Sequence, residues 1–227
     1  NVTIPEAHAD VSIAALLRGL AVLCEKPLAD TLPAALAMIA SAEAGDRLLM
    51  VSQSPRYWRN AEAPRGQIAQ LGRIGFVACS LFRGPHFGGV REQMAHPLLK
   101  DMAVHQFDLA RDLIGSEPVS ISCESFNPGW SWFAGDAAAE VNAEFADGTR
   151  FVFSGSWCSP GLETSWNGSW RISGADGTAL WDGDHPPVAQ TADGTPIPAA
   201  IGTGPEEIDG SLAEFVAALR DGSVPSG

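Results

Sequence analysis

Two short, uninterrupted apolar runs in the first quarter of the chain restrict its fold more than any other pattern. They are Leu20 to Cys24 and the middle of "RLLMVSQ", residues 47–53. A continuous apolar run of this length is typical of a strand buried on both faces of a parallel sheet. Residues 6–18 and 31–44 have helical spacing, so helix and strand alternate. This order predicts part of a doubly wound α/β unit.

The second half of the sequence has a different pattern. Residues 72–82, "GRIGFVACSLF", are expected to form a strand after a helical link over residues 65–71. Asp147-Gly148 and Asp176-Gly177 each separate two strand-like runs, which is a strong hairpin signal. From residue 119 onward strands dominate. We therefore expect an α+β domain with a mainly antiparallel sheet.

The helix ends are predicted from local signals. Gly19 and Gly45 are expected to end the first two helices, and Asp30 or Thr31 to cap the second. Near the C-terminus, Ser211 and Glu214 have the spacing of a capping box at the start of the last helix. The segment 185–204 is rich in Pro, Gly and Thr and is expected to be a long loop.

The composition excludes several classes of partner. Hydrophobic residues make up 45% of the 227 residues and charged residues 18%, as in folded globular proteins. The net charge of −13 argues against nucleic acid or an anionic membrane surface as the main partner. No apolar run approaches the ~20 residues of a membrane span. We expect a protein of the cytoplasm, and its acidic charge does not exclude a small ligand that bears a phosphate.

The four cysteines are scattered, with no CxxC pair and no spacing typical of a metal site. An even number of cysteines allows two disulfides. For a chain of this size we favour buried free thiols, and we predict no metal site. The cysteines are Cys24, Cys79, Cys123 and Cys158.

The segment "HPLLKDMAVHQFDLARDL", residues 96–113, has the apolar spacing of a packed helix. Asp101 and His105 are four residues apart in it and would project from the same helix face. A carboxylate beside an imidazole can orient the ring and assist proton transfer near neutral pH. The alternative is a solvated polar stripe that continues through Asp108 and Asp112.

Glu25, Lys26 and Pro27 follow directly after the first buried strand. In an open α/β sheet, ligands bind beyond the carboxyl ends of the strands, so a lysine there can meet ligand oxygens. The proline restricts the backbone and permits a cis peptide. The alternative is a simple turn with charged surface residues.

Together these features resemble the glucose-fructose oxidoreductase and inositol dehydrogenase family, written Gfo/Idh/MocA. The resemblance is carried by "HADVSIAALLRGLAVLCEKPLA", "GRIGFV" and "HPLLKDMAVHQFDLARDLIG", and more loosely by "GSW" and "WRISGADGTALWDG". It implies the C-terminal part of a Rossmann domain that binds NAD or NADP, over residues 1–60. It also implies a substrate domain with an open sheet over residues 61–227. The family usually oxidises a sugar or cyclitol hydroxyl or catalyses the reverse reduction.

The resemblance also implies roles for particular residues. Lys26 matches the family lysine that contacts the substrate hydroxyl, and His105 would accept the hydroxyl proton as hydride leaves the carbon. Asp101 would bind the substrate and support the charge balance. Glu25, Lys26, Pro27 and His8 would lie near the cofactor, although for His8 packing within the helix is an alternative.

Other candidates are weaker. Tyr57 follows a strand end and His96 precedes a proline at the expected mouth of the cleft, so both are candidates for the substrate pocket. Trp157 and Asn167 could give a sugar an apolar face and a hydrogen bond. For the tryptophan, packing in the sheet or at a subunit interface is the alternative, and for His96 packing at the helix start.

The chain has no GxGxxG fingerprint after a strand, so we expect that fingerprint upstream of residue 1. About 60–90 further residues would supply the missing half-sheet, and the C-terminus is also expected to continue. The prediction is an NAD(P)-dependent oxidoreductase acting on a sugar or polyol, assembled as a homo-oligomer through its open sheet. The alternatives are an NAD-dependent glycoside-cleaving enzyme of the same fold and a non-catalytic regulatory or scaffold relative.

Overall fold

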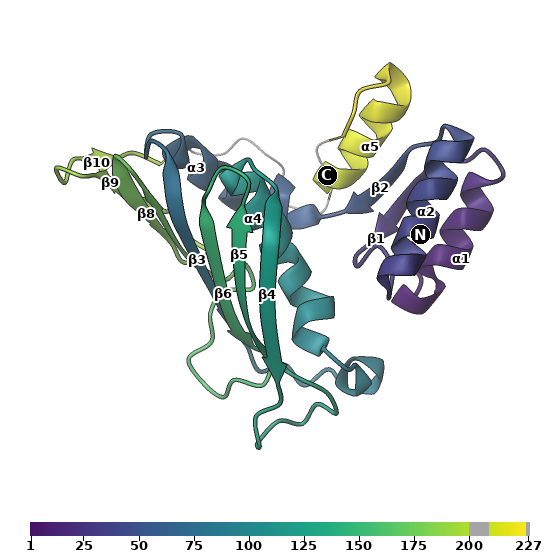
Figure 1. Cartoon of the computed structure of the whole chain (residues 1–227), viewed down its shortest axis with the longest axis horizontal. Helices are drawn as coiled ribbons and strands as arrows, with labels where there is room; N and C mark the ends of the chain where they lie inside the picture. The colour runs from purple at the N-terminus through teal and green to yellow at the C-terminus, as the bar shows by residue number, and fades with distance from the viewer. Residues whose placement is uncertain (200–208, 226–227) are drawn as a thin grey trace. The chain divides into compact units, whose positions relative to one another are not determined.

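The computed structural model describes residues 1–199 and 209–225, which form two compact units. The first unit contains Asn1–Trp58 and the C-terminal helix α5 (Figure 1). The second contains the described residues from Arg59 to residue 199. The predicted division, with residues 61–227 as one domain, therefore differs at the C-terminus, because α5 is grouped with the first unit.

The first unit has the expected alternation of helices and parallel strands. Strands β1 and β2 pair in parallel, with Val22 opposite Leu49 and Glu25 opposite Ser52. Apolar residues of α1, β1 and α2, including Leu16, Cys24 and Met38, form its buried core. The elements are α1 (Pro5–Leu16), β1 (Val22–Glu25), α2 (Leu32–Gly45), β2 (Leu49–Ser52), the short helix η1 (Ser54–Tyr57) and α5 (Asp209–Asp221).

The ends of α2 show one confirmed prediction and one correction. Thr31 is the N-cap, and its side chain accepts a hydrogen bond from the Ala34 N–H at 3.4 Å. Gly45 is the last helical residue and not the residue after the helix, and Asp46 adopts the left-handed conformation there, with φ of 49°. Aspartate tolerates this region better than most residues, so the glycine is not needed there.

The capping box expected for the last helix is wrong. Helix α5 begins at Asp209, so Ser211 is its third residue rather than its N-cap. Ser211 is buried, and its hydroxyl lies 3.0 Å from that of Ser52 at the end of β2. Glu214 accepts a hydrogen bond from the Tyr57 hydroxyl. These contacts attach α5 to the first unit, and tertiary structure overrides the local capping signal.

The second unit is built on an eight-stranded sheet, counted over the described residues, in the order β10-β9-β8-β7-β3-β6-β5-β4. The pair β3 and β6 is parallel and all other neighbours are antiparallel, so the mainly antiparallel sheet is confirmed. The strands are β3 (Ile74–Phe82), β4 (Pro118–Phe126), β5 (Ala138–Phe145), β6 (Arg150–Ser156), β7 (Ser169–Gly174), β8 (Gly177–Trp181), β9 (Val188–Thr191) and β10 (Pro196–Ile197).

Both Asp-Gly hairpins are confirmed. β5 and β6 turn at Asp147-Gly148, where Gly148 has φ of 91°, and β7 and β8 turn just before Gly177. The long loop predicted over 185–204 is wrong for its described part, because it contains the hairpin of β9 and β10. Ala189 and Ile197 of this hairpin are buried. Burial of these two apolar side chains outweighs the loop-like composition around them.

Helices cover one face of the large sheet (Figure 1). They are α3 (Arg59–Ile68) and α4 (Val104–Ile114), with α3 starting six residues before the expected link. Inward residues alternate along the strands, as in β6, where Phe151 and Phe153 are buried. Phe107 of α4 packs edge-on against Phe153, with ring centroids 5.3 Å apart. The core thus fixes α4 to the inner face of the sheet.

The four cysteines are free thiols. Three are buried as expected, whereas Cys123 on the edge strand β4 is exposed. Burial raises the pKa of the Cys79 thiol well above its ordinary value, which makes it a poor nucleophile near neutral pH.

Among the described residues, no helix combines the length and apolar character needed to cross a membrane.

Candidate active site

The turn after β1 carries Lys26 at the predicted edge of the parallel pair. β1 ends at Glu25 beside the end of β2, so Lys26 lies at the carboxyl end of both strands. The Lys26–Pro27 peptide is cis, the form that the sequence permits. The Lys26 N–H donates to the Glu25 carboxylate at 3.2 Å, and both side chains are half-buried. This is the edge at which doubly wound sheets bind their ligands.

His8 supports this turn through a contact with the backbone of Pro27. Its imidazole is 1% exposed and lies between two backbone carbonyl groups. Nδ1 is 2.8 Å from the Pro27 oxygen, and Nε2 is 3.0 Å from the Thr3 oxygen. Both ring nitrogens therefore face the protein's own backbone. Of the two roles left open for His8, this geometry favours packing over contact with a cofactor.

The segment with Asp101 and His105 is not a regular α-helix throughout. Leu98–Ala103 form a π-helical turn, η3, and α4 begins only at Val104. Hydrogen bonds in a π-turn run from i to i+5, so the four-residue spacing does not have its α-helical meaning there. The regular α-helix predicted over this stretch is therefore wrong, although the two residues remain on one continuous helical segment. Single π-turns occur often at functional sites.

Asp101 has a partner that the sequence did not indicate. The Arg91 Nε donates to Asp101 Oδ2 at 2.9 Å. The Asp101 side chain is 14% exposed and that of Arg91 54%. Arg91 lies in the short helix η2 (Gly89–Gln93), ten residues earlier in an irregular segment, so no periodic pattern connects the two. A charge-assisted bond of this kind fixes the position of the carboxylate.

His96 and Tyr57 are both engaged by other side chains. His96 Nδ1 lies 3.2 Å from the Ser125 hydroxyl and 3.6 Å from a carboxylate oxygen of Asp136. The Ser125 hydroxyl donates to that same carboxylate at 2.7 Å. Tyr57 donates to Glu214 of α5. His96, just before η3, is thus held by Ser125 and Asp136. Tyr57 helps to attach α5 to the first unit.

Trp157 and Asn167 lie in the second unit in different roles. Trp157 is 3% exposed and packs against Trp166, with ring centroids 6.3 Å apart. Asn167 is buried, and its side-chain amide donates to the Gly183 oxygen at 2.8 Å. The Asn167 amide nitrogen therefore stabilises the loop before β7.

The structure gathers the predicted residues into two groups, one in each unit. His8, Glu25, Lys26 and Pro27 form the group in the first unit. The second unit contains Asp101 and His105 on one helical segment, with the tryptophans of the nearby loops. Within the described residues, no cluster of three or more His, Cys, Asp or Glu side chains could hold a metal ion.

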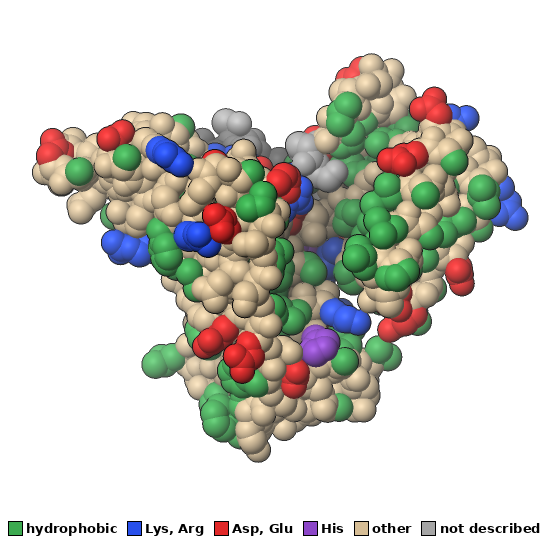
Figure 2. Space-filling model, viewed as in Figure 1, with side chains coloured by type: hydrophobic (Ala, Val, Ile, Leu, Met, Phe, Trp, Pro, Cys, Tyr) green, Lys and Arg blue, Asp and Glu red, His purple; other side chains and the backbone are tan. Residues whose placement is uncertain are grey.

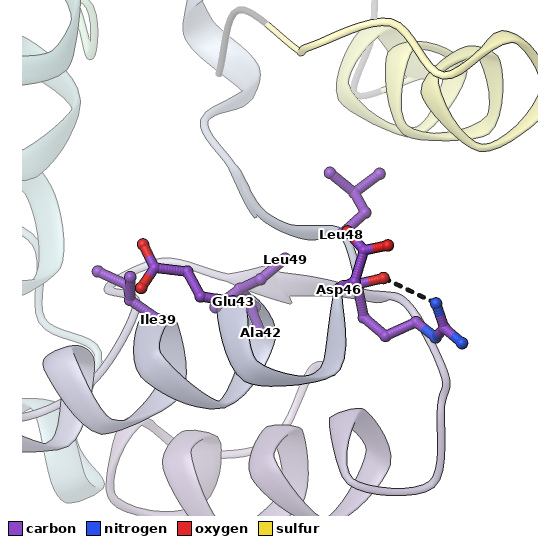
Figure 3. Close-up of a pocket in the computed structure, with 7 residues that line it drawn as sticks. Ile39, Ala42, Glu43, Asp46, Leu48 and Leu49 are labelled. Carbon is purple, nitrogen blue, oxygen red and sulfur yellow. Dashed lines mark hydrogen bonds between the residues drawn. The ribbon is translucent and has the colours of Figure 1, made fainter.

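A shallow pocket of about 420 Å³ in the first unit is not part of this arrangement (Figure 3). It is lined by the end of α2 and the start of β2, including Glu43, Arg47 and Leu49. Leu49 is the first residue of β2, so the pocket lies at the amino end of the strand. Lys26 follows the opposite end. The pocket is therefore not at the ligand-binding edge of the sheet.

Comparison with known proteins places the chain in a family. Residues 34–180 match the Gfo/Idh/MocA C-terminal domain. Residues 2–53 match the oxidoreductase family with the NAD-binding Rossmann fold. The chain belongs to the Gfo/Idh/MocA oxidoreductase family, with part of its Rossmann domain followed by its C-terminal domain.

Two curated relatives illustrate the similarity. An uncharacterized protein, y4oX, of Sinorhizobium fredii is 32% identical over 186 residues, covering 78% of this chain and 51% of the relative. D-apiose dehydrogenase of Paraburkholderia graminis is 28% identical over 245 residues, covering 98% and 63%. The chain thus spans between half and two thirds of the length of these relatives.

Solved structures share the fold. An oxidoreductase from Agrobacterium radiobacter, in complex with NAD⁺, L-tartaric acid and magnesium, superposes with a TM-score of 0.85 at 18% identity, covering 99% of this chain and 70% of that one. The aldose-aldose oxidoreductase from Caulobacter crescentus superposes with a TM-score of 0.84 at 22% identity, covering 99% and 69%. The predicted combination of Rossmann domain and antiparallel-sheet domain is confirmed.

We predict that His8→Ala lowers the free energy of unfolding by about 2–4 kcal/mol, because it leaves a cavity and removes a hydrogen-bond donor to a backbone carbonyl oxygen. Urea denaturation followed by circular dichroism measures the change. His185→Ala is the matched control, since that imidazole is 80% exposed and its ion pair with Asp182 is also exposed, so its loss should change the free energy of unfolding little. Equal stability of the His8→Ala variant and the wild type would contradict the packing role.

Proposed function

We propose that this chain is the larger part of an NAD(P)-dependent oxidoreductase that transfers a hydride between a nicotinamide cofactor and a sugar or cyclitol. The observation that carries the proposal is the presence of Lys26, Asp101 and His105 at the positions of the family motifs. Each lies on the expected kind of element, a strand end or a helical segment. Relatives named D-apiose dehydrogenase and inositol 2-dehydrogenase support the substrate class.

The residues of the first unit fit a dinucleotide. Parallel strands β1 and β2 end side by side at Glu25 and Ser52, the edge at which such sheets hold dinucleotides. Lys26 supplies an ammonium group there, and the backbone of Glu25, Lys26 and Pro27 would border the cofactor. His8 would support the turn instead of touching the cofactor, because both of its ring nitrogens face backbone oxygens of the protein. When bound, NAD or NADP supplies the hydride acceptor.

The proposed roles follow from the needs of alcohol oxidation. A ring nitrogen of His105 takes the proton from the substrate hydroxyl. The hydride leaves the carbon that bears this hydroxyl, so that a carbonyl forms. The Lys26 ammonium stabilises the negative charge that develops on the oxygen. Asp101, oriented by Arg91, binds the substrate. In the reverse reduction the imidazolium returns the proton to the oxygen.

The cofactor and the substrate class are tested with the complete protein that contains this chain. We expect NAD or NADP to be reduced in the presence of inositol or D-apiose, measured by the absorbance of the reduced nicotinamide. Tightly retained NAD without net turnover would indicate the glycoside-cleaving alternative. If calorimetry detects no binding of either cofactor, the proposal fails.

We predict that Lys26→Ala and His105→Ala each lower kcat by about a hundredfold or more, since each removes a group that acts on the reacting oxygen. The melting temperature should change little, because the Lys26 side chain is half-buried and neither residue belongs to the hydrophobic core. His185→Ala serves as the histidine control. Wild-type kcat in either active-site variant would remove that residue from the mechanism.

We also propose that the open face of the large sheet pairs with a second copy of the chain. Its side chains include Phe76, Phe126 and Leu180, which are 43%, 45% and 48% exposed. Such apolar groups on an uncovered sheet are suited to an isologous interface. Light scattering should give at least twice the monomer mass, and Leu180→Lys should lower it. A monomeric wild type would exclude this interface.

A further inference from the structure

Three aromatic side chains of the second unit form a cluster that the proposed mechanism does not use. The aromatic cluster consists of Phe87, Trp157 and Trp166, whose ring centroids lie 6.3–6.4 Å from one another. Trp157 is buried, whereas Phe87 is 49% exposed and Trp166 38% exposed. The cluster thus has a buried base and two partly exposed aromatic surfaces.

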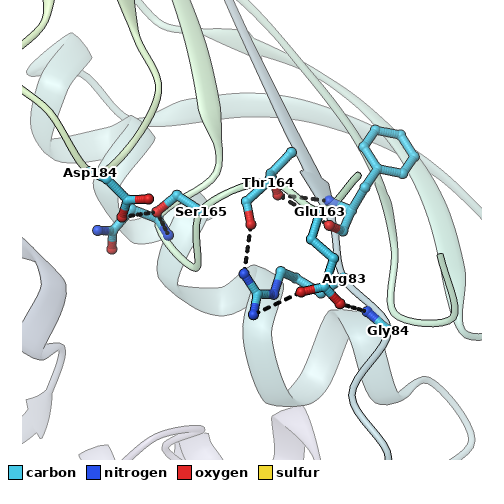
Figure 4. Close-up of polar contacts among 8 residues, drawn as sticks. Arg83, Gly84, Glu163, Thr164, Ser165 and Asp184 are labelled. Carbon is cyan, nitrogen blue, oxygen red and sulfur yellow. Dashed lines mark hydrogen bonds and ion pairs between the residues drawn. The ribbon is translucent and has the colours of Figure 1, made fainter. Parts of the chain in front are cut away.

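Two arginines lie over the exposed rings. The guanidinium carbon of Arg83 is 4.1 Å from the Trp166 ring centroid, and that of Arg91 is 5.2 Å from the Phe87 centroid. Arg83 is held by an ion pair with Glu163 at 3.0 Å and by a bond to the Thr164 oxygen at 2.7 Å (Figure 4). These contacts fix the guanidinium against the tryptophan face.

The aromatic cluster is attached to the proposed catalytic segment at two points. Arg91, which lies over Phe87, also forms the ion pair with Asp101. Gln106, the residue after His105, donates from Nε2 to the Trp166 backbone oxygen at 3.1 Å. A ligand resting on these rings would therefore lie close to Asp101 and the start of α4.

Three buried polar atoms around Trp166 lack a hydrogen-bond partner among the described residues. They are Arg83 Nε, Gln106 Oε1 and Trp157 Nε1. Gln106 is 2% exposed and Trp157 3%. Buried polar atoms without partners are rare in folded proteins and call for a water or a ligand. Here they offer two donors and one acceptor beside an aromatic surface.

We infer that the aromatic cluster is the subsite that holds the ring of the sugar substrate, an inference that rests on the proposed oxidoreductase function. The apolar C–H face of the sugar would lie on Trp166 and Phe87. Its hydroxyl groups, which both donate and accept, would match the three unpartnered atoms. Those three atoms have almost no accessible surface, so a movement of the surrounding loop side chains would have to accompany binding.

The charges favour an uncharged sugar. Each arginine at the aromatic cluster is paired with a carboxylate, Arg83 with Glu163 and Arg91 with Asp101. Each pair has no net charge, so neither guanidinium needs an anionic group of the substrate to balance its charge. A sugar acid or sugar phosphate would have to displace one of the ion pairs.

The inference is tested by titrating the complete protein, saturated with its cofactor, with the sugars of the activity screen in a calorimeter. Trp166→Ala should raise the Kd for the sugar about tenfold, because a stacked aromatic contact contributes about that factor to the affinity. Trp166→Phe should recover most of the affinity. The Kd for the cofactor should not change. In steady-state assays the loss should fall on KM and leave kcat within about twofold.

Leu162→Ala is the control from the same loop, because Leu162 is fully exposed. It should leave sugar binding unchanged. Unchanged sugar affinity in Trp166→Ala would overturn the inference, as would equal losses in Trp166→Ala and Leu162→Ala. If the sugar binds in a Trp166-dependent way but no cofactor is turned over, the proposed reaction fails while the subsite stands.

Discussion

The packing of α4 against the inner face of the large sheet is the contact on which the second unit depends. Phe107 meets the rings of Phe151 and Phe153, and Leu109 and Leu113 are buried on the same core. Fully burying such a side chain stabilises the fold by about 1.5–3 kcal/mol, which few exposed ion pairs match. Because this apolar face fixes the helix, its other residues are free to carry chemistry. The π-turn η3 comes directly before α4 and carries Asp101, whereas His105 lies in the first turn of α4 itself.

The contacts around Asp101 connect the aromatic cluster with the helical segment that carries His105, the proposed proton acceptor. Arg91 contacts both Phe87 and Asp101, and Gln106 connects α4 with the backbone of Trp166. Gln106 is the neighbour of His105 in α4, so one helix carries both His105 and the hydrogen bond to the Trp166 backbone. Orientation of a substrate on rigid elements contributes much of the acceleration in many enzymes. In the first unit, His8 gives the Lys26 turn a comparable buried support.

Sequence reasoning recovered the elements whose signal is local. The apolar runs gave β1 and β2, and the Asp-Gly pairs gave the hairpins of β5 with β6 and β7 with β8. The family motifs supplied the three candidate catalytic residues, whose roles remain predictions. Sequence reasoning did not reveal the π-turn, since apolar spacing cannot distinguish one additional residue in a turn. It also missed Arg91, because its contact with Asp101 crosses an irregular segment. The prediction that Ser211 caps the last helix was wrong, because its hydroxyl forms a tertiary contact with Ser52.

The attachment of α5 to the first unit has a consequence for biosynthesis. Ser52 and Ser211, whose hydroxyls meet, are 159 positions apart. The whole second unit lies between them in the chain, as an insertion within a discontinuous domain. Closing so long a loop is entropically costly and slow unless the intervening residues are already compact. On the ribosome, the inserted unit can therefore mature while the first still lacks α5, and early release of the nascent chain would leave β2 and Tyr57 uncovered.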